Sequence, residues 1–238
     1  MIGHLLRWTA AIVRKSPITI GLVGFCVVVL SASVLGADTR LLGSSSSKGA
    51  PDPEAGLSDS QRQAMHDAAH ARNSRYLKEF VAAGRDPHSL PIVRVETYEA
   101  APPNLGAALA AADAVVIGRV LNVTFADNPS GGMPIATATV EVTRKIRGTV
   151  GSTITIQQLG GPVATESGGA LAEFDTDQLL LPGDEAILML KLKGGVFHPV
   201  PAAGVNLVRN GRVLAEASNP FRLLFTGHSV DEVAAYLT

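Results

Sequence analysis

The stretch LLLPGDEAILMLKL, residues 179–192, constrains the possible folds of this chain more than any other segment. Its Pro-Gly-Asp, residues 182–184, is typical of a tight turn, and the residues after the turn alternate at period two. Both faces of this segment are apolar, with Ala186, Leu188, Leu190 and Leu192 on one face and Ile187 and Met189 on the other. A strand that is apolar on both faces lies inside a sheet, with further structure covering each side. Residues 113–216 are therefore expected to surround this strand.

Short strand patterns recur on both sides of this segment. They predict a short strand within 91–98, an Ala-rich helix at 104–112, and strands at 113–124, 134–147, 152–158, 195–200, 204–209 and 212–216. Gly118 predicts a bulge in the first long strand, and Asn210-Gly211 predicts a two-residue hairpin turn. The Gly-rich residues 160–177 are expected to form a loop. Many short strands at such intervals indicate a mainly β fold, either a sandwich or a barrel.

Four runs in this region resemble one kind of domain: ADAVVIGRV, VEVTRKIRGTVGSTITIQQLGG, LLPGDEAILML and GVNLVRNGRV. Over roughly residues 113–216, the pattern of apolar strand residues and turn glycines resembles that of a bacterial exported OB-like β-barrel domain of uncharacterised function. The Lys-Gly that is usual in that pattern is Arg147-Gly148 here. The resemblance implies a small, closed or partly open OB-like barrel with flanking short helices, at residues 91–217, and an extracytoplasmic setting. It brings no catalytic residue with it.

The N-terminal region has the pattern of a membrane anchor. A basic leader, residues 1–17, precedes a transmembrane helix predicted at 18–36. Residues 16–37 carry no charge and, as a helix, would cover roughly 30 Å of hydrocarbon. The basic leader predicts a cytoplasmic N-terminus, a single pass through the cell membrane and an extracytoplasmic C-terminal domain. The alternative is a cleaved signal peptide, with a small-residue cleavage site at residues 31–33.

A polar tether and a helix are predicted between the anchor and the β region. Residues 37–57 are rich in Gly, Pro and Ser and predict a flexible linker. Residues 58–84 predict a juxtamembrane helix, which Ser58 and Gln61 begin with a capping box and Gly84 ends. A second capping pattern, Ser229 with Glu232, predicts a short helix in the C-terminal segment, residues 218–238.

The juxtamembrane helix contains a histidine pair, His66 and His70, four residues apart on one helix face. The pattern resembles the zinc-protease H-E-x-x-H, but Asp67 stands in place of the general-base glutamate. Asn73 and Tyr76 stand where the longer form of the motif has a glycine and a third histidine. These departures favour a solvent-facing pair over a metal site. Replacing both histidines by alanine is then expected to leave the stability nearly unchanged.

No other pattern predicts a catalytic, cofactor or metal site. The acidic residues Asp175, Asp177, Asp184 and Glu185 lack the spacing of calcium ligands and are expected to be solvated turn residues. Ser167 lies in a Gly-rich loop without a recognisable base, and His198 lies in a predicted strand. Cys26 is the only cysteine, so the chain forms no internal disulfide and no cysteine-zinc cluster.

Nucleic-acid binding is not expected either. The formal net charge is -1, so no bulk basic field is present. The aromatics of the β region, Phe125, Phe174 and Phe197, are not interleaved with a basic stripe.

The sequence therefore favours a non-catalytic, membrane-anchored binding module whose partner is a protein or another envelope component. One alternative is an accessory factor or inhibitor of an exported protease, by analogy with the barrel of tissue inhibitors of metalloproteinases, whose N-terminal cysteine is absent here. The other is a zinc-dependent hydrolase that uses His66 and His70.

Overall fold

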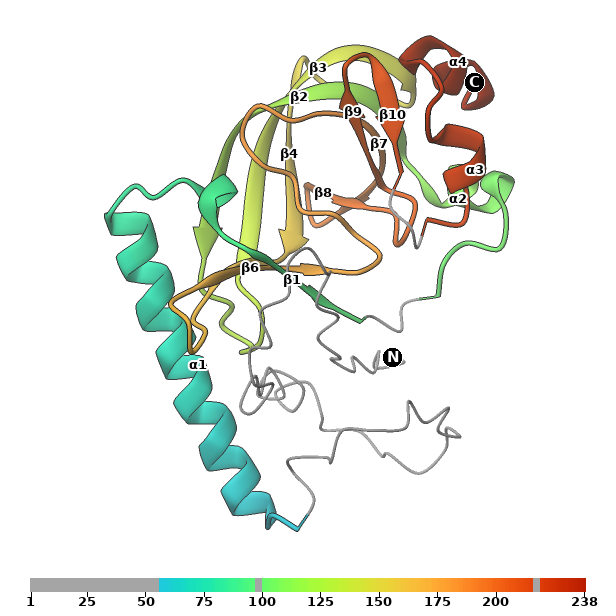
Figure 1. The fold of residues 1–238 in the computed structure, drawn as a ribbon. Helices are drawn as coiled ribbons and strands as arrows, with labels where there is room; N and C mark the ends of the chain where they lie inside the picture. Colours follow the sequence, from blue (N-terminus) through green and yellow to red (C-terminus); the bar gives the residue numbers. More distant parts are fainter. Residues whose placement is uncertain (1–55, 97–99, 216–218) are drawn as a thin grey trace, which may run out of the picture.

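A computed structural model describes residues 56–96, 100–215 and 219–238. The predicted leader, transmembrane helix and nearly all of the linker lie outside these residues. Within the described ranges, no helix combines the length and the apolar composition that a membrane span needs. The described chain is mainly β, as predicted, with two sheets, one long helix and several short helices (Figure 1).

The described elements follow one another as α1 (Asp59–Ala82), η3 (Pro87–Ser89), β1 (Ile92–Val95), α2 (Leu105–Ala111), β2 (Ala114–Ala126), β3 (Ile135–Arg147), β4 (Thr153–Leu159), β5 (Gly161–Val163), β6 (Ala170–Phe174), β7 (Glu185–Lys193), β8 (Val196–Pro199), β9 (Val205–Arg209), β10 (Arg212–Leu214), α3 (Arg222–Phe225) and α4 (Val230–Tyr236). The larger sheet has the order β10-β9-β7-β2-β3-β4-β8, and β8 also pairs with β7. The smaller sheet has the order β1-β6-β5.

Strand β7 lies in the interior of the larger sheet, between β2 and β9. Its five central residues, 186–190, are all fully buried. Leu188 and Leu190 pack in one apolar cluster with residues of β2, β3 and β4, whereas Ile187 and Met189 pack in another. The strand is therefore covered on both sides, which confirms the prediction. The apolar face ends at Leu190, because Leu192 is 49% exposed.

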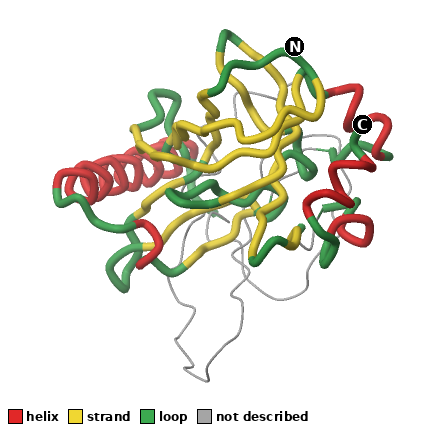
Figure 2. Tube along the Cα trace, turned by 90° about the horizontal axis from the view of Figure 1, so that it is seen from above, coloured by secondary structure: helices red, strands yellow, loops and turns green. Residues whose placement is uncertain are grey.

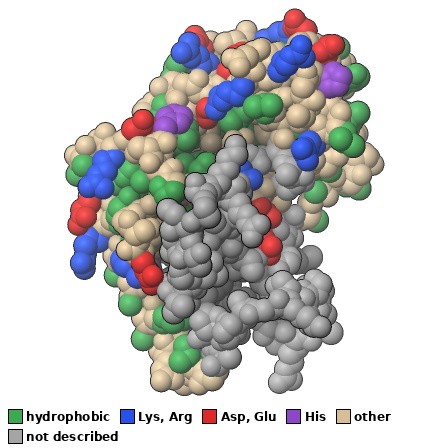
Figure 3. All heavy atoms as spheres, in the orientation of Figure 1, with side chains coloured by type: hydrophobic (Ala, Val, Ile, Leu, Met, Phe, Trp, Pro, Cys, Tyr) green, Lys and Arg blue, Asp and Glu red, His purple; other side chains and the backbone are tan. Residues whose placement is uncertain are grey.

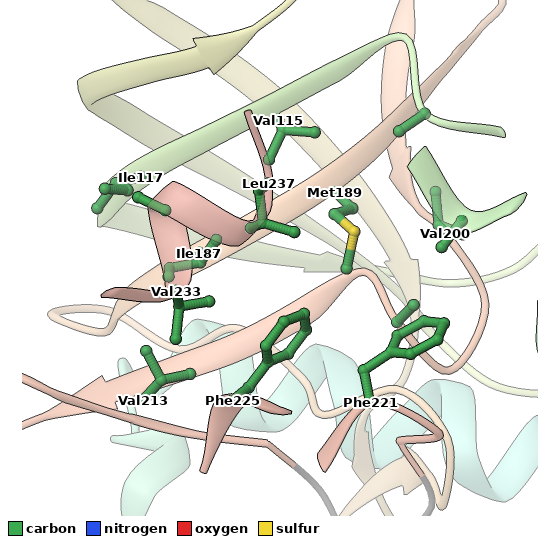
Figure 4. Close-up of a cluster of buried hydrophobic side chains, with 14 of the residues drawn as sticks. Val115, Ile117, Ile187, Met189, Val200, Val213, Phe221, Phe225, Val233 and Leu237 are labelled. Carbon is green, nitrogen blue, oxygen red and sulfur yellow. The ribbon is translucent and has the colours of Figure 1, made fainter. Parts of the chain in front are cut away.

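The C-terminal segment covers one side of β7 and β2 (Figure 4). Phe221, Phe225, Val233 and Leu237 point toward Ile187 and its neighbours and bring α3 and α4 onto the sheet. The predicted capping box at the start of α4 is present in full. The predicted C-terminal segment thus contributes to the core.

Two local predictions about the strands are confirmed. The β2–β3 register shifts between Ile117 and Gly118, where a Cβ would lie 2.9 Å from the carbonyl oxygen of Glu141. Only glycine fits so close to the neighbouring backbone. Asn210 and Gly211 both have positive φ, 53° and 72°, as a type I′ hairpin requires.

The prediction of a loop at residues 160–177 is wrong. This region contains β5 and β6, and β6 pairs in parallel with β1. Strand β1 is thereby part of the smaller sheet and not of the larger one. Strand β5 has only three residues, Gly-Pro-Val, which is too short for any period-two pattern.

Helix α1 contacts β5 and β2 and lies on the side of the molecule opposite to α3 and α4 (Figure 2). Its N-terminal capping box forms as predicted. Phe80 makes an edge contact with Phe125 of β2, with ring centroids 6.5 Å apart, and the Asn73 side chain accepts a hydrogen bond from Ala164 N. The helix is thus part of the folded domain.

Candidate functional site

The outer surface of β2, β3 and β4 carries an array of polar side chains, here called the polar face. Its nine residues are Arg119, Asn122 and Thr124 of β2, Thr137, Thr139 and Glu141 of β3, and Thr153, Thr155 and Gln157 of β4. Their apolar neighbours in β3 and β4, such as Ala138, Val140, Ile154 and Ile156, point inward and are buried. The polar face is therefore the solvent side of a sheet whose other side is core.

The strand register aligns these residues in three rows across the sheet. The rows are Thr124-Thr137-Gln157, Asn122-Thr139-Thr155 and Arg119-Glu141-Thr153. Neighbours within a row lie on strands about 4.8 Å apart, and successive rows are about 6.7 Å apart along β3 and β4. These two strands thus present polar groups at two regular spacings, whereas in β2 a register shift separates Arg119 from Asn122 by three residues.

Local sequence rules account for the threonines of the polar face but not for all of it. Threonine is β-branched and common on solvent-facing strand positions. Asparagine is depleted in strands, and Asn122 follows the third register shift of the β2–β3 pairing, after Val120. This irregularity turns the Asn122 amide into the middle row, beside Thr139.

The polar face carries little charge. Arg119 and Glu141 occupy facing positions and have opposite signs. The basic residues at the end of β3 lie beyond the rows: Arg144 pairs with Asp231, and Arg147 donates to the carbonyl of Leu109. In the view of Figure 3, basic and acidic side chains are likewise interspersed and form no field of one sign.

The two histidines of α1 lie in different surroundings. His66 is 4% exposed, on the same face of α1 as the buried Asn73 and Leu77, so the prediction of a solvent-facing pair is wrong for it. The side chain of His70 is 37% exposed, with Nε2 4.0 Å from Asp127 Oδ2. Among the described residues, no three His, Cys, Asp or Glu side chains are grouped to hold a metal ion.

The Asp127 carboxylate also accepts a hydrogen bond from the Ser74 hydroxyl, at 2.5 Å. Serine, histidine and aspartate thus meet, but not in the order that catalysis requires. A catalytic histidine lies between the nucleophile and the acid, whereas here the acid is the direct partner of the hydroxyl. This contact is an attachment of α1 to the end of β2.

Burial of His66 changes the expected effect of alanine substitutions. His66→Ala should lower the free energy of unfolding by about 1–3 kcal/mol because it empties a packed position, whereas His70→Ala should change it by about 0.5 kcal/mol or less. Urea denaturation of the full chain, together with elemental analysis for zinc, tests both positions. Equal small effects would contradict the buried packing of His66, and stoichiometric zinc that is lost in both variants would restore the hydrolase alternative.

Buried polar side chains hold the segment that leads into β7, a feature that the sequence patterns missed. Three consecutive backbone N–H groups donate to three different side chains: Leu179 N to Glu173, Leu180 N to Gln158 and Leu181 N to Asp184. The Glu173 and Asp184 carboxylates also pair with Arg94 and Arg209. Such bonds satisfy backbone that is buried outside a strand ladder. The expectation that Asp184 is a solvated turn residue is therefore wrong, since it is 3% exposed.

The remaining candidates from the sequence lie apart from the polar face or at its border. Asp175 and Asp177 follow β6, and Glu185 is exposed at the start of β7. Ser167 Oγ lies 3.1 Å from Thr165 Oγ1 in the loop between β5 and β6. His198, in β8, is half-buried, and burial followed by the nearby Lys193 lowers the pKa of its imidazole. His198 is therefore neutral near pH 7.

The three aromatics named from the sequence do not form a stacking platform. Phe197 packs against the interior cluster of the larger sheet, Phe174 against the cluster of the smaller sheet, and Phe125 between α1 and the core. None of them belongs to the polar face.

A hollow of about 350 Å³ lies between the C-terminal half of α1 and the end of β2. It is lined by Leu77, Lys78, Val81, Ala82, Phe125, Ala126 and Asp127. Apart from Lys78 and Asp127, this lining is apolar. Small-molecule sites combine an apolar lining with several convergent polar groups, and this hollow offers only two charged side chains.

Comparison of the chain with protein-family models and with curated proteins finds no match.

Proposed function

We propose that this chain is a non-catalytic, membrane-anchored binding module that displays the polar face of an OB-like barrel outside the cytoplasm. The strand pairings support the barrel. Strand β8 pairs antiparallel with β7 and in parallel with β4, so a circuit of pairings runs β7-β2-β3-β4-β8-β7. If β2, β3, β4, β7 and β8 are numbered 1 to 5 along the chain, the order of strands around this circuit is 1-2-3-5-4-1. A sheet that closes on itself has no exposed strand edges, which is a physical reason to favour a barrel.

The observation that carries the binding role is the polar face itself. Strands β3 and β4 are the second and third strands of the proposed barrel, and OB folds bind extended polymers on that part of the surface. This step is an analogy between folds, since a fold alone does not determine function. A second support comes from this chain itself: hydroxyl and amide groups are aligned across all three strands of the surface.

The anchor and the extracytoplasmic location are supported by the uncharged residues 16–37 and by the basic residues before them. An envelope component is then the partner within reach. A protease-inhibitor role is a weaker proposal, because it rests only on the shared type of barrel.

Site-specific photo-crosslinking in the producing cells tests the binding role. A benzophenone amino acid in place of Thr155, in the middle row, should crosslink to an envelope component. The same amino acid in place of Leu214, which is 44% exposed on β10 at the far end of the strand order, is the matched control and should crosslink less. No adduct at position 155, or equal adducts at both positions, would contradict a binding role for the polar face.

A further inference from the structure

We infer that the ligand of the polar face is a neutral polysaccharide, an inference that rests on the proposed binding role of that surface. Seven of its nine residues are Thr, Asn or Gln, and the other two have opposite charges in facing positions. The partner should therefore be extended, uncharged and rich in hydrogen-bonding groups. A neutral polysaccharide carries hydroxyl groups along its whole length.

The low charge argues against an anionic polymer. Nucleic acids and acidic polysaccharides are held largely by Lys and Arg, with a strong dependence on salt. The polar face has only Arg119, which faces Glu141, and two of the three basic residues at the end of β3 are engaged with other parts of the fold. A single cation beside a carboxylate does not make an anion-binding surface.

The composition also argues against a protein partner. The cores of protein–protein interfaces are enriched in aromatic residues and Met, and their hot spots are often Trp, Tyr or Arg. The three rows contain no aromatic residue and no large aliphatic residue. Two exposed leucines border the rows. Leu121, 53% exposed, is the extra residue at the register shift before Asn122, and Leu159, 40% exposed, pairs with Ile135 one row beyond Gln157.

The hydrogen-bonding groups suit hydroxyl partners. A threonine hydroxyl donates one hydrogen bond and accepts two, and an amide offers both donors and an acceptor. Thr139, Thr155 and Asn122 bring these groups side by side in the middle row. A sugar hydroxyl, which is itself donor and acceptor, can be satisfied at each position, whereas a purely anionic group would use only the donors.

Binding of the full-length chain to immobilised polysaccharides tests this inference. The chain is kept in a zwitterionic detergent without sugar head groups and is applied to an α-glucan, a β-glucan, a mannan and a galactan, with an acidic polysaccharide and a single-stranded oligonucleotide for comparison. At least one neutral polysaccharide should retain the chain. Retention should hardly change between about 50 and 200 mM salt, a range over which a protein with many phosphate contacts loses about 10³-fold or more in affinity.

Hydroxyl-deleting variants locate the binding. The double variant Thr139→Val with Thr155→Val keeps side-chain shape and strand propensity but removes two hydroxyls from the middle row. It should bind about tenfold more weakly or worse, with an unchanged thermal midpoint, since each lost hydrogen bond contributes about 1 kcal/mol. Thr149→Val removes an exposed hydroxyl outside the rows and should bind as the unmodified chain does.

Three results would overturn the inference: no neutral polysaccharide is retained, retention falls steeply with salt, or the double valine variant binds like the unmodified chain. A crosslink from position 155 to a protein, combined with no polysaccharide retention, would reject the polysaccharide and keep the binding module. Absence of any crosslink would reject the binding module itself.

Discussion

Truncation of Leu188 or Leu190 to alanine should lower the free energy of unfolding by about 2–5 kcal/mol. Both side chains are fully buried in β7, in the cluster that joins β7 to β2, β3 and β4. Alanine removes methyl groups from this cluster and leaves a cavity that the surrounding strands can only partly fill. A loss of this size is a large part of the total stability of a domain, and a urea denaturation curve of the full chain measures it.

Lys191→Ala is the matched control, because it truncates the neighbouring residue of the same strand. Lys191 is exposed, so its truncation should change the unfolding free energy by about 0.5 kcal/mol or less. Similar small effects at positions 188, 190 and 191 would contradict the burial of β7 and the arrangement of the larger sheet around it.

Glu173→Ala should have the second largest effect, a loss of about 3 kcal/mol. The Glu173 side chain is 2% exposed, lies 3.2 Å from Arg94 and accepts the backbone N–H of Leu179 at 3.1 Å. Alanine leaves a guanidinium without this carboxylate and a buried N–H without this acceptor, and each loss is costly in a poorly solvated place. Because Glu173 links the smaller sheet to the segment before β7, the cooperativity of unfolding should also fall.

Glu166→Ala removes an acid of the same type from the exposed loop between β5 and β6 and should leave the unfolding free energy unchanged within about 0.5 kcal/mol. Thermal unfolding followed by circular dichroism compares the two variants. If Glu173→Ala were as stable as Glu166→Ala, the buried contact with Leu179 N would not contribute to holding the segment that leads into β7.

The long strands could be predicted from the sequence because their periodicity is strong. Strands β2, β3 and β7 span 9 to 13 residues, with buried alternate positions or a buried centre. The hairpin at Asn210 and the capping boxes at Ser58 and Ser229 could also be predicted from the sequence, because each depends on a few neighbouring residues.

Features that depend on contacts distant in sequence were not predictable in the same way. The pairing of β1 with β6 joins residues 79 apart, and β5 is too short to show a pattern. Burial of His66 is a tertiary property of α1, and a helix pattern alone does not contain it. Asp184 was expected to be a solvated turn residue, and Glu173 fell within the predicted loop, because the backbone N–H groups that donate to them come together only in the folded chain.

Only part of the polar face could be predicted from the sequence. Alternating threonines on β3 and β4 indicate solvent-facing positions, but the alignment of Asn122 with Thr139 and Thr155 follows from the register shift in β2. A register shift of this kind changes which side chains share a row, and strand patterns alone do not give it.

Cysteine accessibility in intact cells tests the display of the polar face outside the membrane and its occupancy in one measurement. Cys26 is the only native cysteine, so Thr155→Cys and Leu214→Cys can each be studied in a Cys26→Ser background. A membrane-impermeant maleimide should label both in the membrane fraction of intact cells. Labelling at position 155 should be several-fold slower than in purified protein, relative to position 214, because a bound envelope component covers the polar face. Three results would contradict an anchored, extracytoplasmic binding module. The maleimide would label the cysteines only after lysis, the ratio of the labelling rates at positions 155 and 214 would be the same in cells and in purified protein, or the chain would be a soluble product trimmed near Ser33.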